Sequence, residues 1–132
     1  MSIESWRKEY LPMPFPDTII GSLKHSIRKW EGLNRASLMF HGLGAQCGRI
    51  YESINELCPE KQLFAGDITC ALCQYVDGKG WYDCHYCPLG TCSDEWMGWY
   101  HSGNTAPMLT KLRAALRREQ RKARAKRNRC KN

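Results

Sequence analysis

The sequence lacks several features that would place the chain in a large class of proteins. Among its 132 residues, no apolar run approaches the length that spans a membrane, so we expect a soluble protein with no membrane partner. Residues 1–8 contain no apolar core of a secretory signal, which favours a reducing cytoplasm. No internal repeat is present, and the length predicts one domain with a tail.

Catalytic motifs are also missing. Gly42-Leu43-Gly44 lacks the flanking pattern of a phosphate-binding loop. A redox enzyme would carry its C-x-x-C pair in a βαβ context, and the sequence around these pairs does not predict one. His41 and His101 have no motif partners, and the position of His85 beside Cys84 is weak evidence for a nucleophile and base. We therefore predict no catalytic residues and expect that the protein is not an enzyme.

Cysteine, by contrast, is abundant: five of the eight cysteines lie between residues 70 and 92. Two C-x-x-C pairs separated by a short segment are typical of tetrahedral zinc, because each tight turn directs two thiolates at one ion. We predict one Zn²⁺ per chain, held by four of the five cysteines in this window: Cys70, Cys73, Cys84, Cys87 and Cys92. The fourth place is open between Cys84 and Cys92, with His85 as a further option.

Two other interpretations of these cysteines are weaker. An iron–sulfur cluster would use the same thiolates, and disulfides would require an oxidising compartment. The Asp77-Gly78 pair between Tyr75 and Trp81 predicts a turn, so we expect a β-hairpin that zinc staples. Outside this window we predict that Cys47 is a core residue and Cys130 a free exposed thiol, and we assign no role to Cys58.

The rest of the chain predicts a mainly helical protein. We expect a proline-rich N-terminal arm over residues 1–16, a helical domain over 17–116 with the zinc hairpin at 70–92, and a basic tail over 117–132. Apolar stripes predict a helix from Asp17 to Gly32, a second from Leu43 to Leu57, a short aromatic helix from Ser93, and a final helix capped by Asn104 or Thr105. A short strand is expected at 62–67. Four cations off the first stripe are interpreted as a solvated face: Lys24, Arg28, Lys29 and Arg35.

Charge is distributed unevenly along the chain. Residues 111–132 hold eleven Lys and Arg against one Glu, while residues 1–110 hold nine Lys and Arg against twelve Asp and Glu. A concentrated basic segment gains affinity for nucleic acid through counterion release, so a nucleic acid or nucleoprotein machine is the expected partner. A solvated tail that aids solubility is the alternative. The predicted contacts are Arg113, Arg117, Arg118, Arg121, Lys122, Arg124, Lys126, Arg127 and Arg129.

Several short motifs together resemble the small cysteine-rich proteins of tailed bacteriophages. The motifs are Cys70-Ala71-Leu72-Cys73, the segment 83–89 (DCHYCPL), Cys92, and the upstream segment 27–31 (IRKWE). The resemblance implies a bacterial host cytoplasm and action on host machinery. It supports a second hypothesis, an inhibitor or adaptor that docks on a host protein through the acidic body and the proline-rich arm. A metal-dependent or iron–sulfur enzyme ranks third.

Overall fold

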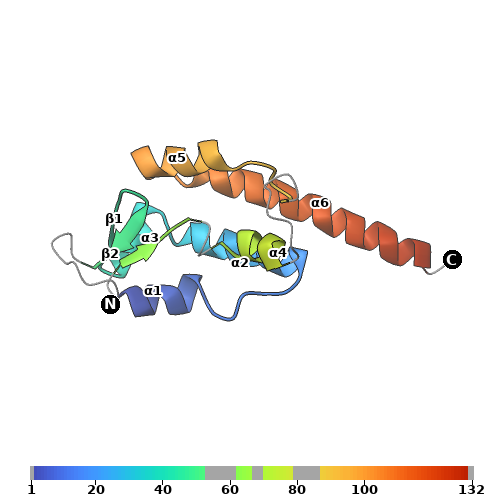
Figure 1. The fold of residues 1–132 in the computed structure, drawn as a ribbon, viewed down its shortest axis with the longest axis horizontal. Coiled ribbons are helices and arrows are strands. Elements are labelled where there is room, and N and C mark those ends of the chain that lie inside the picture. The colour runs from blue at the N-terminus through green and yellow to red at the C-terminus, as the bar shows by residue number, and fades with distance from the viewer. Residues whose placement is uncertain (1, 53–61, 67–69, 79–86, 131–132) are drawn as a thin grey trace.

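The computed structural model describes residues 2–52, 62–66, 70–78 and 87–130, and its elements surround one core (Figure 1). The predicted mainly helical class is confirmed. None of the helices in these ranges is both long and apolar enough to cross a bilayer. In chain order the elements are α1 (Ile3–Tyr10), α2 (Ile19–Glu31), α3 (Arg35–Phe40), β1 (Gly44–Gln46), β2 (Arg49–Tyr51), β3 (Gln62–Phe64), α4 (Ala71–Gly78), α5 (Ser93–Ser102) and α6 (Ala106–Cys130).

Helix α2 is the central element, because α1, α4 and α6 all pack against it. Its apolar stripe buries Leu23 and Trp30 completely or nearly so. The helix begins at Thr18, whose side chain accepts a hydrogen bond from the Gly21 amide, and ends at Gly32. The predicted helix is therefore confirmed, with the N-cap one residue later than Asp17.

The N-terminal segment corrects one expectation. We predicted a proline-rich arm over residues 1–16, but residues 3–10 form helix α1. Ser2 and Ser5 close a capping box: each backbone amide donates to the other side chain, at 2.9 and 3.2 Å. Burial of Ile3 and Trp6 holds the helix on the core. The prolines confine the non-helical backbone to residues 11–18.

The small sheet lies where a second helix was predicted. Strands β1, β2 and β3 are antiparallel in that order, and the buried Ile50 pairs with Ala45 on one side and Leu63 on the other. The chain reverses at Cys47 and Gly48, which have φ values of 55° and 77°. Two successive left-handed residues suit a tight hairpin and cannot continue a helix.

The structure also tests the predictions for Cys47 and for the strand that follows the hairpin. Cys47 is exposed in the hairpin turn, so its assignment to the core was wrong. The expected strand at 62–67 is confirmed over Gln62–Phe64, which form β3, whereas Ala65 and Gly66 are not in a strand. The later part of the predicted second helix, with Ile54, Leu57 and Cys58, lies outside the described residues.

The expected zinc hairpin also needs correction, because residues 71–78 form helix α4 and not a strand. Asp77 and Gly78 are the last residues of this helix, so they do not form the predicted turn between two strands. Residues 79–86, which include Trp81 and Cys84, lie outside the described residues. The observed sheet is therefore formed by β1, β2 and β3, and the first part of the cysteine window is helical.

The last two helices follow the prediction closely. Helix α5 carries Asp94 and Glu95 in its first turn. It ends at Gly103, whose φ of 75° lies in the left-handed region that favours glycine. Helix α6 packs on α2 and α5 through its first three turns, which bury Met108, Leu112 and Ala115. It then continues as an unbroken helix to Cys130 and extends past the rest of the molecule (Figure 1).

Candidate functional site

Four cysteines from the predicted metal window lie near one another, and we call them the thiol cluster: Cys70, Cys73, Cys87 and Cys92. Cys70 precedes α4 and Cys73 lies in its first turn, while Cys92 immediately precedes α5. Cys87 begins a turn in which the Gly90 amide donates to the Cys87 carbonyl at 2.8 Å. Three of the four thiols therefore lie at the N-terminal ends of helices, where the backbone stabilises negative sulfur.

A cavity of about 380 Å³ separates α2, α4, α5 and α6 at this point, and three of these thiols line it. The aromatic helix α5 contributes Trp96 and Met97 to the lining of the cavity. Trp96 is fixed there because its indole nitrogen donates to the carbonyl of Ala65 at 3.1 Å. The walls are otherwise mainly apolar, so the sulfurs face a region of low dielectric constant.

Lys29 is the cation of this site, and its position corrects its assignment to a solvated face. Its side chain is only 1% exposed. The ammonium donates to the carbonyl oxygens of Ala65 and Gly66, at 3.1 and 3.3 Å. Burying an ammonium costs several kcal/mol unless hydrogen bonds and nearby negative charge compensate it. The Cys70 sulfur is near enough to interact electrostatically with the Lys29 ammonium.

The electrostatics of the thiols agree with that pairing. A hydrogen bond with Cys73, opposed by burial and assisted by the Lys29 ammonium and Ser26, holds the pKa of Cys70 well below its usual range. The pKa of Cys73 is raised, first by its hydrogen bond to Cys70, then by burial and by the charges of Cys70, Cys92 and Cys87. The charges of the other three sulfurs thus disfavour ionisation of Cys73, a repulsion that a divalent cation would relieve.

The chemistry of the donor set fits zinc: four thiols, two of them in a C-x-x-C turn, with a buried cation beside them. Within the described ranges, no three Cys, His, Asp or Glu side chains are already gathered around one point as ligands. The cluster contains Cys92, one of the two alternatives for the fourth ligand, and the other alternative, Cys84, lies outside the described residues.

Helix α6 anchors the segment that carries two of these cysteines. The Arg118 guanidinium donates to the carbonyl of Pro88 at 3.1 Å. Lys111 donates to the carbonyl of Thr91 and, at 3.1 Å, to the carboxylate of Glu95 on α5. Two residues of the basic region therefore support the thiol cluster.

The remaining residues predicted to contact a polyanion do not bond to the segment that carries Cys87 and Cys92 in the described part of the chain. Arg113 lies 3.9 Å from the carboxylate of Glu31, and Lys122 pairs with Glu119 within α6 at 3.1 Å. Six others have exposed side chains on the part of α6 beyond its apolar stripe: Arg117, Arg121, Arg124, Lys126, Arg127 and Arg129. Residues 117–130 are hereafter the distal half of α6.

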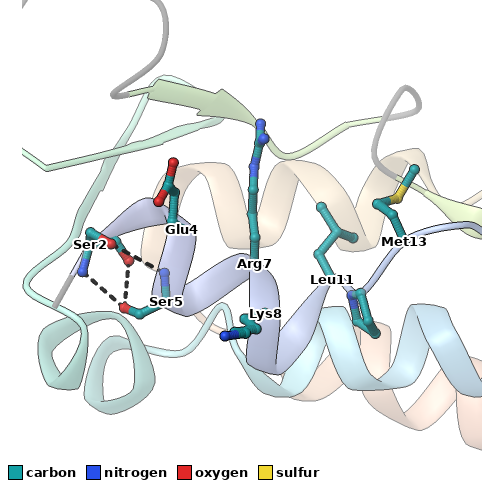
Figure 2. Close-up of a pocket in the computed structure, with 8 residues that line it drawn as sticks. Ser2, Glu4, Ser5, Arg7, Lys8, Leu11 and Met13 are labelled. Atoms are coloured by element: carbon teal, nitrogen blue, oxygen red, sulfur yellow. Dashed lines mark hydrogen bonds between the residues drawn. The ribbon is translucent and has the colours of Figure 1, made fainter.

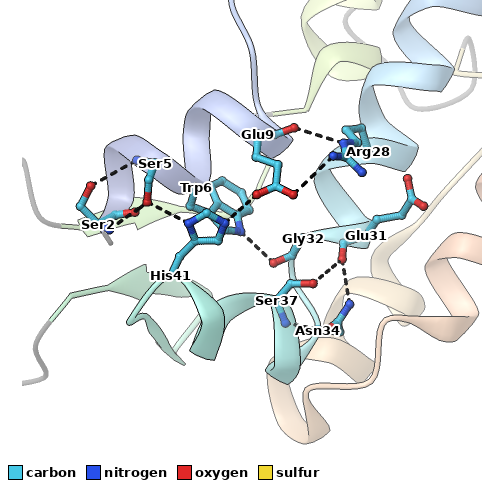
Figure 3. Close-up of polar contacts among 10 residues, drawn as sticks. All are labelled: Ser2, Ser5, Trp6, Glu9, Arg28, Glu31, Gly32, Asn34, Ser37 and His41. Carbon is cyan, nitrogen blue, oxygen red and sulfur yellow. Dashed lines mark hydrogen bonds and ion pairs between the residues drawn. The ribbon is translucent and has the colours of Figure 1, made fainter.

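Sequence reasoning missed a second polar cluster, centred on the buried His41 (Figure 3). Its Nδ1 lies 2.8 Å from the Ser5 hydroxyl, and its Nε2 lies 2.8 Å from a carboxylate oxygen of Glu9. Catalytic triads place the serine at Nε2 and the acid at Nδ1, the reverse of this arrangement. The Ser5 hydroxyl also takes part in the helix cap, within hydrogen-bond distance of the Ser2 carbonyl at 2.9 Å. We interpret the cluster as a structural link between α1 and α3.

A hollow of about 670 Å³ runs along α1, but its polar side chains do not converge (Figure 2). Ser2 and Ser5 are committed to the capping box, and Arg7 and Lys8 leave the helix on different sides. An active site needs several polar groups directed at one reacting atom. This hollow therefore offers no catalytic arrangement.

Comparison with known proteins returned no match to this chain, whether among protein-family models, curated proteins or solved structures. The function is accordingly inferred from the thiol cluster and from α6.

Two functional residues could not be identified from the sequence. Lys29 is held beside the thiol cluster by the carbonyls of Ala65 and Gly66, which lie 36 and 37 residues later in the chain. Ser26, one turn before Lys29, places its hydroxyl 3.7 Å from the Cys70 sulfur. The available signal was their i, i+3 spacing on α2, which a search for apolar stripes ignores.

Proposed function

We propose that this chain is a small, non-enzymatic zinc-binding protein that binds nucleic acid, or a nucleoprotein machine, through the distal half of α6. One observation carries the proposal: α6 stays helical for about four turns beyond its last buried residue, Ala115, and those turns expose arginine and lysine. Such a helix gives a polyanion a preformed row of charges, so little conformational entropy is lost on binding.

The zinc would be structural in this proposal. We assign its ligands to Cys70, Cys73, Cys87 and Cys92, with Lys29 compensating part of the negative charge of the tetrathiolate. A bound zinc would join the start of α4 to the segment that leads into α5. The resemblance to phage proteins would place the chain in a bacterial cytoplasm, where thiols remain reduced.

Metal content tests the first part of the proposal. Elemental analysis of protein purified without chelator should find about one zinc per chain and a colourless solution. A brown protein with iron and acid-labile sulfide would replace zinc with an iron–sulfur cluster. Absence of any metal in the folded protein would overturn the metal site altogether.

Binding tests the second part. The parent chain should bind a generic RNA of about 20 nucleotides, or a DNA duplex of similar length, with an affinity that falls steeply with salt. The alternative partner is a host protein, as expected for an inhibitor or adaptor. If affinity purification from the native host recovers the same partners after nuclease treatment, and neither oligonucleotide binds, the host-protein function takes precedence.

A further inference from the structure

A groove of about 390 Å³ lies between the first half of α2 and the distal half of α6. It is lined by the half-buried Ile20 and Ala123, by Lys24 from α2, and by Arg124 and Arg127 from α6. Gln120 completes the lining, so the six lining residues include three cations and no carboxylate. The groove is separate from the thiol cluster and shares no lining residue with its cavity.

Among the described residues, these three cations lack the ion pairs that several other cations on the same two helices form. On α2, Arg28 lies 3.6 Å from a carboxylate oxygen of Glu9. On α6, Lys111, Arg113 and Lys122 each lie within 4 Å of a glutamate. Within the described part of the chain, Lys24, Arg124 and Arg127 have no ion-pair partner. Bringing three like charges together is unfavourable without a counterion, and an anion in the groove would remove that cost.

The arrangement along α6 indicates what kind of anion fits. The lining residues on α6 run from Gln120 to Arg127. At 1.5 Å per residue this stretch is about 10 Å long. It matches about three nucleotide steps of about 3.4 Å each and exceeds a single phosphate group.

We propose that the α2–α6 groove binds the phosphodiester backbone of a nucleic acid, with Lys24 and Arg127 on opposite sides of the strand. The inference rests on the proposed function and extends it, because it adds a contact from the body of the protein to those of the distal half of α6. Lys24 would then position the nucleic acid relative to the core, without reading its bases.

The test compares two lysines with the same change of charge. Lys24→Gln removes the groove cation, while Lys8→Gln removes an exposed lysine on α1 that does not line the groove. Fluorescence anisotropy with the same RNA, labelled, should show Lys24→Gln weakening binding about three- to tenfold at about 0.1 M salt, whereas Lys8→Gln should weaken it less than about twofold. Arg127→Gln should reproduce the effect of Lys24→Gln from α6.

Two outcomes overturn the groove and leave the proposed function intact. One is steep, salt-dependent binding by the parent that Lys24→Gln and Lys8→Gln weaken equally. The other is displacement of the RNA by inorganic phosphate more than by chloride at equal ionic strength, which would indicate a site for a single phosphate group. Failure of the parent to bind any oligonucleotide would instead overturn the proposed function itself. Unchanged melting temperatures of the variants would confirm that the comparison concerns binding.

Discussion

The thiol cluster and the distal half of α6 place positive charge in opposite environments. Beside the thiols, one ammonium is buried and donates to two fixed carbonyl oxygens. On the distal half of α6, six arginine and lysine side chains extend into solvent and form no ion pair within the described residues: Arg117, Arg121, Arg124, Lys126, Arg127 and Arg129. The buried ammonium is desolvated and is compensated by fixed hydrogen bonds, whereas the exposed cations remain solvated.

Because of this difference, we expect the buried charge to affect the stability of the fold and the exposed charges to affect binding. A buried charge with fixed partners contributes to folding, and removing it leaves unsatisfied groups in the core. Exposed like charges contribute little to folding, but they accumulate counterions whose release drives binding to a polyanion. Substitutions at the thiol cluster should therefore change unfolding, and substitutions on the distal half of α6 should change binding.

The largest effect is expected at the thiols themselves. Cys73→Ser removes one ligand from the start of α4, and we expect loss of zinc together with more than about 3 kcal/mol of stability, because metal binding and folding are coupled in small zinc domains. Thermal unfolding followed by circular dichroism, together with elemental analysis, measures both quantities.

Cys130→Ser is the matched control, since Cys130 is exposed at the end of α6. It should leave the melting temperature and the metal content unchanged. Equal melting temperatures for Cys73→Ser and the parent would exclude a structural metal. They would also show that the thiol cluster contributes no more to stability than the end of α6.

The next effect concerns affinity alone. Substituting Gln for Arg117, Arg121, Lys126 and Arg129 removes exposed cations that lie outside both the groove and the cluster. If the helix contacts about five phosphates of a duplex, the parent should show a log–log salt slope near −4 to −5, and a rise in salt of about fourfold should reduce affinity by about two to three orders of magnitude. The variant should flatten that slope by about one unit for each phosphate that it no longer neutralises.

Arg118 stays unchanged in this variant because its guanidinium supports the Pro88 carbonyl next to Cys87. The melting temperature of the four-site variant should accordingly match that of the parent. Shallow and identical salt slopes for both proteins would identify the distal half of α6 as a solvated end, and the host-protein function would become the leading account.

Much of the fold could be predicted because the relevant signals are local. The amphipathic stripe and glycine stop of α2, the acidic first turn of α5 and the apolar stripe of α6 all lie within the helices that they specify. The hairpin at Cys47 and Gly48 was missed for a physical reason. A side chain at position 48 would meet the ring of Trp96 at 2.8 Å, so the need for glycine arises from a residue 48 positions away.

The candidate site was predictable only as far as its ligand types. The C-x-x-C spacing predicted that Cys70 and Cys73 act together, and they do interact through a hydrogen bond. The sequence did not indicate that this pair begins a helix, because Tyr75 and Val76 favour strand in isolation. Tertiary packing of α4 on α2 overrides that preference.

A smaller change of stability should follow from Lys29→Met, which keeps the aliphatic length but removes the buried charge. We expect a loss of about 2–4 kcal/mol, because the carbonyls of Ala65 and Gly66 lose a donor and the thiolates lose a cation. Chemical denaturation measures the free energy of unfolding. Lys24→Met on the exposed side of the same helix is the control and should stay within about 0.5 kcal/mol of the parent. Equal losses for the two variants would show that Lys29 contributes no more to stability than the exposed Lys24.

The smallest effect concerns the contact between α5 and α6. Burial raises the pKa of Glu95, but its own backbone amide and the Lys111 ammonium more than offset this, so the pKa is lowered from its usual value. A carboxylate with a lowered pKa stabilises the fold above its unfolded pKa, and that stabilisation disappears as the pH falls through the folded value. Glu95→Gln should therefore cost about 0.3–1 kcal/mol near neutral pH and almost nothing once the pH is below the folded pKa.

Asp94→Asn tests whether Lys111 is the cause. Asp94 shares the first turn of α5 with Glu95, so its substitution removes a similar interaction with the helix dipole. Only Glu95 receives the Lys111 ammonium, at 3.1 Å. Melting temperatures recorded from about pH 3 to about pH 8 should show a larger pH-dependent loss for Glu95→Gln than for Asp94→Asn. Superimposable pH profiles would assign the effect to the helix dipole and would show that the Lys111–Glu95 ion pair contributes nothing measurable to folding.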